Sequence, residues 1–352
     1  MTIEEIKIRQ MTNQHLLQPA DKMTVVHDLM GIQAQFMGNA IHALKIRCKD
    51  FDEKSFGVGL VKNWTIRGTM HVFAQDDLSL FLPCNAGKDY KRNEWDALSF
   101  WNQRAHWALT PERQSEISQW ILSALEKQAL TREELKDICR KLGMTEAEES
   151  SMFDPWGGGI RQLCERGFIH YAVQENKAFC LTPDFVPMNE KEAALEKARR
   201  YFTHFGPATI HDAMYFFHAT LGQVKEWIGQ LNPECVECDG KIYYYIENPN
   251  ASYNCETPRC LFLAGFDQLM LGYEKKESLY LDRANLRKIF NLAGIVMPSL
   301  MMDGRIIGKW KRTNTNLSVI LFEAIDEHER KMIRDRAKSL WPDELKKIEF
   351  TE

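Results

Sequence analysis

Two glutamines separated by a single residue, Gln33 and Gln35, are the first candidates for chemistry in this sequence. A glutamine side chain offers one carbonyl acceptor and two N–H donors, and it does not titrate near neutral pH. The pair therefore cannot act as a general base, but it can orient a water molecule and stabilise developing charge. A water held in this way could attack a carbon atom on which positive charge develops. The alternative is that both glutamines cap helix ends or lie in solvent.

The spacing of the pair restricts the backbone that can bring both amides to one site. On an α-helix, residues two apart point in roughly opposite directions, whereas on extended or looped backbone the side chains alternate with period two. The glutamines therefore either serve unrelated purposes or lie where the helix predicted for residues 21–31 has ended. Gly31 and Gly38 flank the pair and favour the break, so we expect both amides to face one cleft.

A second candidate group lies in the segment Thr65–Val72, whose alternating pattern predicts a strand. On such a strand, Arg67, Thr69 and His71 would share one face. Facing a groove, this row could contact phosphates or hold Gln35, and a histidine there could in principle act in acid–base catalysis. The sequence leaves open the alternative of a solvent-exposed strand face with one histidine in the core.

The third candidate group is Lys309-Trp310-Lys311-Arg312, in which basic and aromatic side chains alternate at the end of a predicted strand. Lys and Arg contribute sequence-independent affinity for phosphates. Proteins that act on a base often place a wedge or hairpin in a groove of the duplex. We therefore expect Lys309, Trp310, Lys311 and Arg312 to contact nucleic acid; the alternative is a solvated edge strand that lysines protect from aggregation.

Metal and cofactor motifs are weak. Cys235 and Cys238, followed by Cys255 and Cys260, have a spacing that resembles a zinc site, but the first pair falls on a predicted strand, where the side chains diverge. We expect free thiols and no metal. There is no Walker loop or dinucleotide fingerprint, and the glycines after Trp156 are expected to form a turn, so no cofactor is predicted.

The composition sets wider limits. A chain of 352 residues suggests two to four domains, and its apolar content of 44% and charged content of 27% are ordinary. The net charge of −4 argues mildly against nucleic acid but does not exclude it, because a basic channel can coexist with acidic outer faces. There is no apolar run long enough for a membrane span, no signal peptide, and no disulfide pattern among the nine cysteines. These features predict a cytoplasmic protein.

The elements expected to position the candidate residues form three groups, in each of which helices precede a pair of strands. Thr110 before Pro111, Thr131 in a capping box and Thr209 are typical N-caps, and Asp239-Gly240 is typical of a hairpin turn. This order is the winged-helix plan, which we predict for residues 1–108, 109–187 and 188–250. The predicted helices cover residues 4–17, 21–31, 40–47, 56–62, 95–107, 135–140, 158–165, 190–204 and 221–231, and the predicted strand pairs cover 168–172 with 178–181 and 236–238 with 241–246.

After residue 250 the pattern changes to strands. They are expected at residues 260–264, 295–302, 305–311 and 317–322, followed by a helix at 326–339. This order predicts a small β-barrel-like domain over residues 251–352. The expected fold class is α+β, with three tandem winged-helix units and a C-terminal β-barrel-like domain.

Gln33-Ala34-Gln35, taken with Thr65-Ile66-Arg67-Gly68-Thr69-Met70-His71, resembles the AlkZ-like (YcaQ-like) bacterial winged-helix family. The resemblance continues through residues 200–209, 266–273 and 303–312 and so spans most of the chain. Characterised members are DNA glycosylases with a catalytic Gln-x-Gln or Gln-x-Asp pair, and some unhook interstrand crosslinks. The resemblance implies that Gln33 and Gln35 are catalytic and that double-stranded DNA is the partner, with no protein partner required.

The expected activity follows from this resemblance. It implies a monofunctional DNA glycosylase that hydrolyses the N-glycosidic bond of alkylated N7- or N3-type purines. Members that unhook crosslinks often carry a histidine near the proline of Ile295-Val296-Met297-Pro298, and here there is none. That departure weakens the expectation of a crosslink substrate. The alternative is a non-catalytic winged-helix DNA-binding or regulatory protein, which would release no free 7-methylguanine from methylated DNA.

Overall fold

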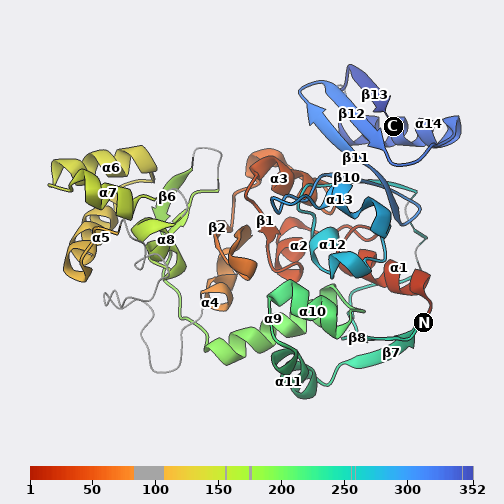
Figure 1. Cartoon of the computed structure of the whole chain (residues 1–352), viewed down its shortest axis with the longest axis horizontal. Coiled ribbons are helices and arrows are strands. Elements are labelled where there is room, and N and C mark those ends of the chain that lie inside the picture. Colours follow the sequence, from red (N-terminus) through yellow and green to blue (C-terminus); the bar gives the residue numbers. More distant parts are fainter. Residues whose placement is uncertain are drawn as a thin grey trace. The chain divides into compact units, whose positions relative to one another are not determined.

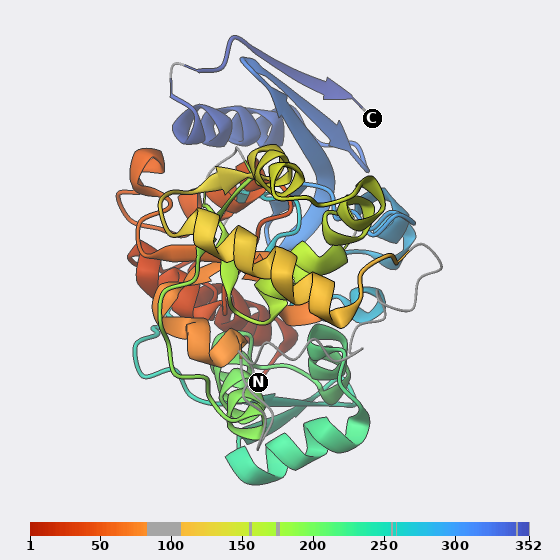
Figure 2. The same cartoon turned by 90° about the vertical axis from the view of Figure 1, so that its left-hand side faces the viewer.

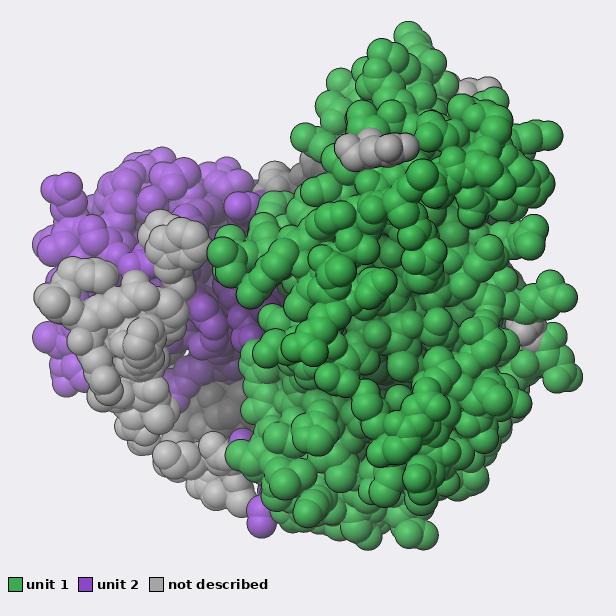
Figure 3. Space-filling model, turned by 45° about the vertical axis from the view of Figure 1, so that its right-hand side comes forward, with its two compact units in different colours: residues 1–53, 197–352 green, residues 54–196 purple. Residues whose placement is uncertain are grey.

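The computed structural model describes residues 1–82, 107–154, 157–173, 177–254, 256–257, 259–342 and 344–351. The chain forms two compact units (Figure 3): unit 1 contains residues 1–53 and 197–352, and unit 2 contains residues 54–196. The helix predicted for residues 95–107 lies almost wholly outside the described residues. None of the described helices is both long enough and apolar enough to span a membrane. The finer division into four domains stays a prediction.

The hairpin at the start of unit 2 differs from the predicted elements. Residues 60–64 form strand β2 (Leu60–Trp64), which pairs with β3 (Met70–Ala74), so the helix predicted over 56–62 is wrong. Phe56, Leu60 and Val61 have helical spacing, but Gly57 and Gly59 weaken a helix, and pairing with β3 buries Leu60 and Val61.

The strand predicted over Thr65–Val72 begins only at Met70. Residues 66–68 form a single 3-10 turn, in which Arg67 has the left-handed φ of 60°. The backbone N–H of Thr65 donates to the carbonyl oxygen of Thr69 at 3.1 Å and closes this turn. Arg67, Thr69 and His71 therefore do not share one strand face. The alternating sequence pattern extends over a turn at residues 66–68 as well as the strand that follows it.

The remainder of unit 2 follows the local signals. Thr110 caps α5 (Pro111–Leu125) with proline at the helix start, and Thr131 forms the capping box of α6 (Arg132–Lys141), as predicted. The core between the helices includes Ile117, Leu135 and Leu163. Strands β3, β2, β5, β6 and β4 are neighbours in that order in one sheet. The other elements are α4 (Leu78–Phe81), α7 (Glu146–Met152), α8 (Gly158–Glu165), β4 (Leu130–Thr131), β5 (Ile169–Tyr171) and β6 (Ala178–Leu181).

Helix α9 (Glu190–His204) leads the chain from unit 2 into unit 1. Thr209 forms the capping box of α10 (Ile210–Phe217), and the predicted hairpin around Asp239-Gly240 is confirmed. Figure 1 shows α10 and α11 near this hairpin. The elements of this part of unit 1 are α1 (Ile3–Asn13), α2 (Lys22–Asp28), α3 (Met37–Lys45), α11 (Leu221–Leu231), β7 (Glu234–Cys238) and β8 (Lys241–Tyr245).

The C-terminal part of unit 1 contains an open five-stranded sheet with the order β13-β12-β11-β10-β9. The predicted barrel is wrong, because β13 and β9 are the two edges and no sheet closes on itself among the described residues. Helix α14 (Glu327–Leu340) returns the chain so that β13, which the sequence did not reveal, pairs parallel to β12. This helix lies beside the C-terminal strands (Figure 2). The strands are β9 (Cys260–Leu263), β10 (Ser299–Met302), β11 (Arg305–Thr313), β12 (Asn316–Leu321) and β13 (Lys347–Thr351).

An aromatic cluster joins α3 to this sheet. The ring of His42 packs against both Trp310 and Trp341, with centroid distances of 4.9 and 5.5 Å, and the two tryptophan rings also contact each other. Its Nε2 lies 2.7 Å from the carbonyl oxygen of Phe262, to which it donates. Burial lowers the pKa of His42 to about 4, so the imidazole is neutral near pH 7.

A buried ion pair fixes the chain that follows α3. Both side chains are fully buried, and the guanidinium of Arg47 binds the carboxylate of Asp267 at 2.6 and 3.0 Å. Arg47 also donates to the carbonyl oxygens of Gln14 and Ala43. Asp267 accepts from the backbone N–H of Leu269 at the start of α12 (Gln268–Leu271). Because each charge is hydrogen-bonded on several sides, the pair offsets its desolvation cost.

We expect Asp267→Ala to lower the free energy of unfolding by about 3–5 kcal/mol, because it leaves the Arg47 charge buried without a counter-charge. The matched control is Glu323→Ala, which breaks the exposed Arg305–Glu323 pair, whose side chains are 53% and 41% exposed. That change is expected to cost under about 1 kcal/mol. Urea unfolding measures both. A loss at Asp267 no larger than that at Glu323 would contradict the role of the buried pair.

We expect the protein to lose stability as the pH falls from about 6.5 toward 4. In this range the unfolded chain binds a proton at His42 that the folded chain excludes, so the contribution is fully present above pH 6.5. The difference between the pKa of His42 in the unfolded and folded chain limits this contribution to stability to roughly 3 kcal/mol. His42→Gln keeps an N–H donor and does not titrate, so its unfolding midpoint is expected to vary less with pH. Parallel midpoint curves for the two proteins would refute this explanation.

Candidate active site

The glutamine pair lies on non-helical backbone between α2 and α3. Helix α2 ends at Asp28 and α3 begins at Met37. Gly31 has a φ of 86°, a conformation that glycine adopts without strain, so the predicted break at this residue is confirmed. Gly38, by contrast, lies in the first turn of α3 and takes no part in the break.

The structure brings the two amides together. Gln33 is only 5% exposed, whereas Gln35 is exposed. Nε2 of Gln33 donates to Oε1 of Gln35 at 3.1 Å. A buried amide therefore orients an exposed one, which is the arrangement expected of two side chains that share a site.

A third glutamine, Gln268, binds the backbone of the loop that carries the pair. Its Nε2 donates to the carbonyl oxygen of Gly31 at 2.7 Å, and this contact is buried. Gln268 directly follows Asp267, the partner of Arg47. Gln268 thus fixes the backbone before the glutamine pair, and its neighbour Asp267 fixes the backbone after α3 through Arg47. Sequence reasoning assigned no role to Gln268, because the distance of 237 residues between these partners leaves no local signal.

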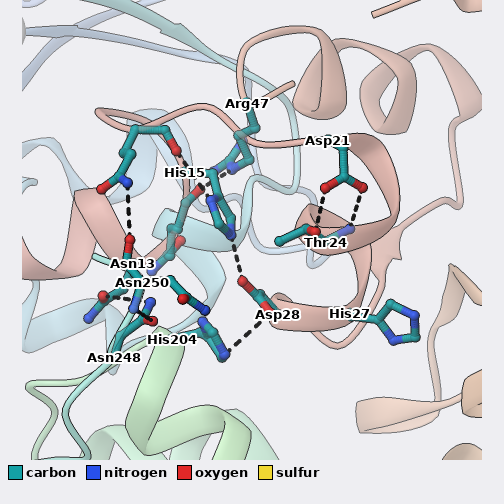
Figure 4. A network of polar contacts seen from close by, with 12 residues as sticks. Asn13, His15, Asp21, Thr24, His27, Asp28, Arg47, His204, Asn248 and Asn250 are labelled. Atoms are coloured by element: carbon teal, nitrogen blue, oxygen red, sulfur yellow. Dashed lines mark hydrogen bonds and ion pairs between the residues drawn. The ribbon is translucent and has the colours of Figure 1, made fainter. Parts of the chain in front are cut away.

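A polar network also fixes the C-terminus of α2 (Figure 4). The Asp28 carboxylate lies 2.8 Å from Nε2 of His15 and 3.4 Å from Nε2 of His204. Burial lowers the pKa of His204 to about 4, which leaves this imidazole neutral near pH 7. No group of three or more His, Cys, Asp or Glu side chains in the described part of the chain is placed to hold a metal ion.

The second candidate group lies in unit 2, where His71 is a core histidine. It is 1% exposed, and its Nδ1 lies 2.9 Å from Oγ1 of Thr65 and 3.1 Å from the carbonyl oxygen of Thr69. Burial, and then the charge of Arg67, lowers the pKa of His71 to about 3. The ring is therefore neutral and covered, which corrects the predicted contact with DNA. Arg67 and Thr69 lie half-buried on the turn, and their contact with DNA stays a prediction.

The third candidate group is divided between the two faces of β11. Trp310 is 8% exposed, and its Nε1 donates to the carbonyl oxygen of Leu263 at 2.9 Å. Arg312 pairs with Glu344 at 2.7 Å and lies over the ring of Trp341. Trp310 is therefore a core residue, which corrects its predicted contact with DNA. Residues two apart on a strand share a face, and the face of β11 that carries Trp310 and Arg312 is covered. Lys309, half-buried, and Lys311, exposed, alternate with these two residues.

The cysteines show no zinc site in the described residues. Cys235, Cys238 and Cys260 form no disulfide. The fourth cysteine of the spacing, Cys255, lies outside the described residues, and so does Trp156 of the glycine-rich segment.

Three comparisons relate this chain to known proteins. The family model described as DNA glycosylase AlkZ-like matches residues 26–341. A curated protein of Streptomyces sahachiroi, named an interstrand DNA cross-link repair glycosylase, is 27% identical over 322 residues, which cover 85% of this chain and 84% of that protein. The solved structure of Streptomyces sahachiroi DNA glycosylase AlkZ superposes with a TM-score of 0.76 over the full length of both chains at 22% identity, a likeness of fold.

Proposed function

Because the chain belongs to the AlkZ-like DNA glycosylase family, we propose that it is a monofunctional glycosylase that hydrolyses the N-glycosidic bond of N7- or N3-alkylated purines in double-stranded DNA. The observation that supports this proposal best is the hydrogen bond between buried Gln33 and exposed Gln35 on non-helical backbone. A pair of oriented amides can hold a water molecule without any change of protonation.

The leaving group explains why neutral amides suffice. An N7- or N3-alkylated purine is a cation in the DNA and departs as a neutral base, so no strong acid is needed to protonate it. The charge that develops lies on the sugar, and an amide oxygen directed at it stabilises the transition state. In this proposal Gln35 aims the water at the sugar carbon, and Gln33 holds Gln35.

Crosslinks through purine N7 share this leaving-group chemistry, and the curated relative is named for crosslink repair. We propose simple alkyl lesions as the principal substrates here, since the segment Ile295-Val296-Met297-Pro298 has no histidine. We also propose that residues 1–108, 109–187 and 188–250 are winged-helix units. The helices α10 and α11 followed by the β7–β8 hairpin support this for the third unit.

Gln35→Ala is expected to slow the release of free 7-methylguanine from methylated duplex by about 100-fold, since one positioning group is worth ~3 kcal/mol in the transition state. Gln35→Glu is expected to retain more activity than Gln35→Ala, because its carboxylate still accepts from water. The matched control is Gln230→Ala, which removes an exposed glutamine of α11. Single-turnover assays measure the rates, and DNA affinity is expected to change little.

The same assays test the reaction class. Amides do not form a Schiff base, so borohydride is expected to trap no covalent complex and the strand is expected to stay intact. Trapping of the wild-type protein would exclude the water mechanism. Release at the wild-type rate by Gln35→Ala would mean that the site is misassigned. The absence of any base release by the wild type would favour a non-catalytic DNA-binding protein.

Lys311→Ala is expected to weaken binding to duplexes of any sequence and to reduce the slope of log affinity against log salt by about one. Lys311 is exposed on the face of β11 opposite Trp310 and Arg312. The control is Lys225→Ala on α11, which lies away from β11 in Figure 1. Fluorescence anisotropy at several salt concentrations measures both. An unchanged slope in Lys311→Ala would identify this part of β11 as a solvated strand.

A further inference from the structure

Phe36, which directly follows Gln35, exposes an aromatic ring to solvent. It is 54% exposed and is the only aromatic side chain among the strongly exposed large hydrophobic residues of the described chain. Phe36 also occupies the N-cap position of α3, where it makes no side-chain capping hydrogen bond. Serine, threonine, aspartate or asparagine there would stabilise the helix. The phenylalanine is therefore only partly buried and gives the helix no cap, so the stability of α3 does not explain why it is there.

The ring of Phe36 has a rigid support on one side. It stacks on Phe266, with the ring centroids 5.9 Å apart and the planes 20° from parallel. Phe266 is buried and has a φ of 57°, which is unfavourable for a bulky residue and must be held by its surroundings. Its backbone N–H donates to the carbonyl oxygen of Val296 at 3.2 Å, and its neighbour Asp267 is anchored by Arg47.

Close packing fixes the distance between this turn and α3. A Cβ atom on Gly265 would lie 2.7 Å from Nδ2 of Asn39, in the first turn of α3, so any larger residue would push the Asn39 side chain aside. On Gly38 of α3, by contrast, a Cβ atom would meet nothing within 4 Å. The first turn of α3 thus has a packed side against residues 265–266 and an open side.

We propose that Phe36 is a platform on which the damaged nucleobase stacks while Gln35 acts on its sugar. This inference rests on the proposed function. An enzyme that reaches the anomeric carbon must disturb the stacking of the target base, and an aromatic side chain restores it. A cationic purine gains further attraction from the electron-rich face of a phenyl ring. The platform therefore gives a physical basis for preferring N7- or N3-alkylated purines to neutral bases.

The test compares Phe36→Ala, Phe36→Leu and Phe36→Trp in the full-length protein. We expect Ala to slow the release of 7-methylguanine by about 10- to 100-fold, as for the loss of one base-stacking residue. Leu keeps apolar surface without an aromatic face and is expected to stay slow, whereas Trp is expected to restore most of the rate. Leu292→Ala, which removes another exposed hydrophobic side chain, is the matched control. Thermal unfolding of each variant verifies that the fold is intact.

A binding measurement separates this inference from the proposed function. The Kd is measured for a duplex with a 2′-fluorinated 7-methylguanine nucleotide, which resists cleavage, and for the unmodified duplex. We expect a preference for the methylated duplex that Phe36→Ala and Phe36→Leu abolish and Phe36→Trp retains. If the wild type prefers the methylated duplex but releases no base, the platform holds and the glycosylase assignment fails. A preference that survives Phe36→Ala, or no preference in the wild type, would overturn the platform.

Discussion

The buried pair of Arg47 and Asp267 is the interaction on which the arrangement of the candidate site depends. It joins the segment after α1, the end of α3 and the start of α12 at one point that solvent does not reach. The residues on either side of Asp267 reach the glutamine loop, because Gln268 binds the carbonyl of Gly31 and Phe266 lies against Phe36. Phe266 and Gln268 therefore contact the loop near its two ends, and Asp267 between them is held by Arg47.

Besides the buried ion pair, several buried polar groups of the described chain are neutral. Burial lowers the pKa of His42, His71, His170 and His204, which leaves these four imidazoles neutral near pH 7. The amides of the glutamine pair have no charge to lose. A site of this kind suits a reaction in which the substrate itself carries the charge that drives the leaving group away.

Local signals predicted much of the fold. The caps at Thr110, Thr131 and Thr209 and the Asp239-Gly240 turn depend on neighbouring residues alone, and all four are found in the structure. The break before Gln33 was predicted from Gly31 and Gly38, of which only Gly31 takes part in it.

Most of the failures come from strand pairing and burial, which local sequence patterns do not contain. Pairing with β3 overrode the helical spacing near Leu60, and the covered face of β11 turned Trp310 into a core residue. The parallel pairing of β13 depends on a helix that returns the chain, and Gln268 depends on a partner 237 residues away. The partners of Trp310, β13 and Gln268 lie outside any short window of sequence, whereas β2 and β3 form a local hairpin whose pairing outweighed the helical spacing.

Unit 1 is built from two segments that are far apart in the chain, and this separation affects when it can fold during synthesis. Arg47 and Asp267 are 220 residues apart, so at typical rates of synthesis the arginine waits on the order of 10–40 s for its partner. Residues 54–196 are contiguous and can fold during this interval. The nascent N-terminal segment meanwhile exposes the apolar sides of α1, α2 and α3, together with an unpaired guanidinium. In the cell this interval is when the protein is open to chaperone binding or to misassembly, and it ends only when residues 260–272 have emerged.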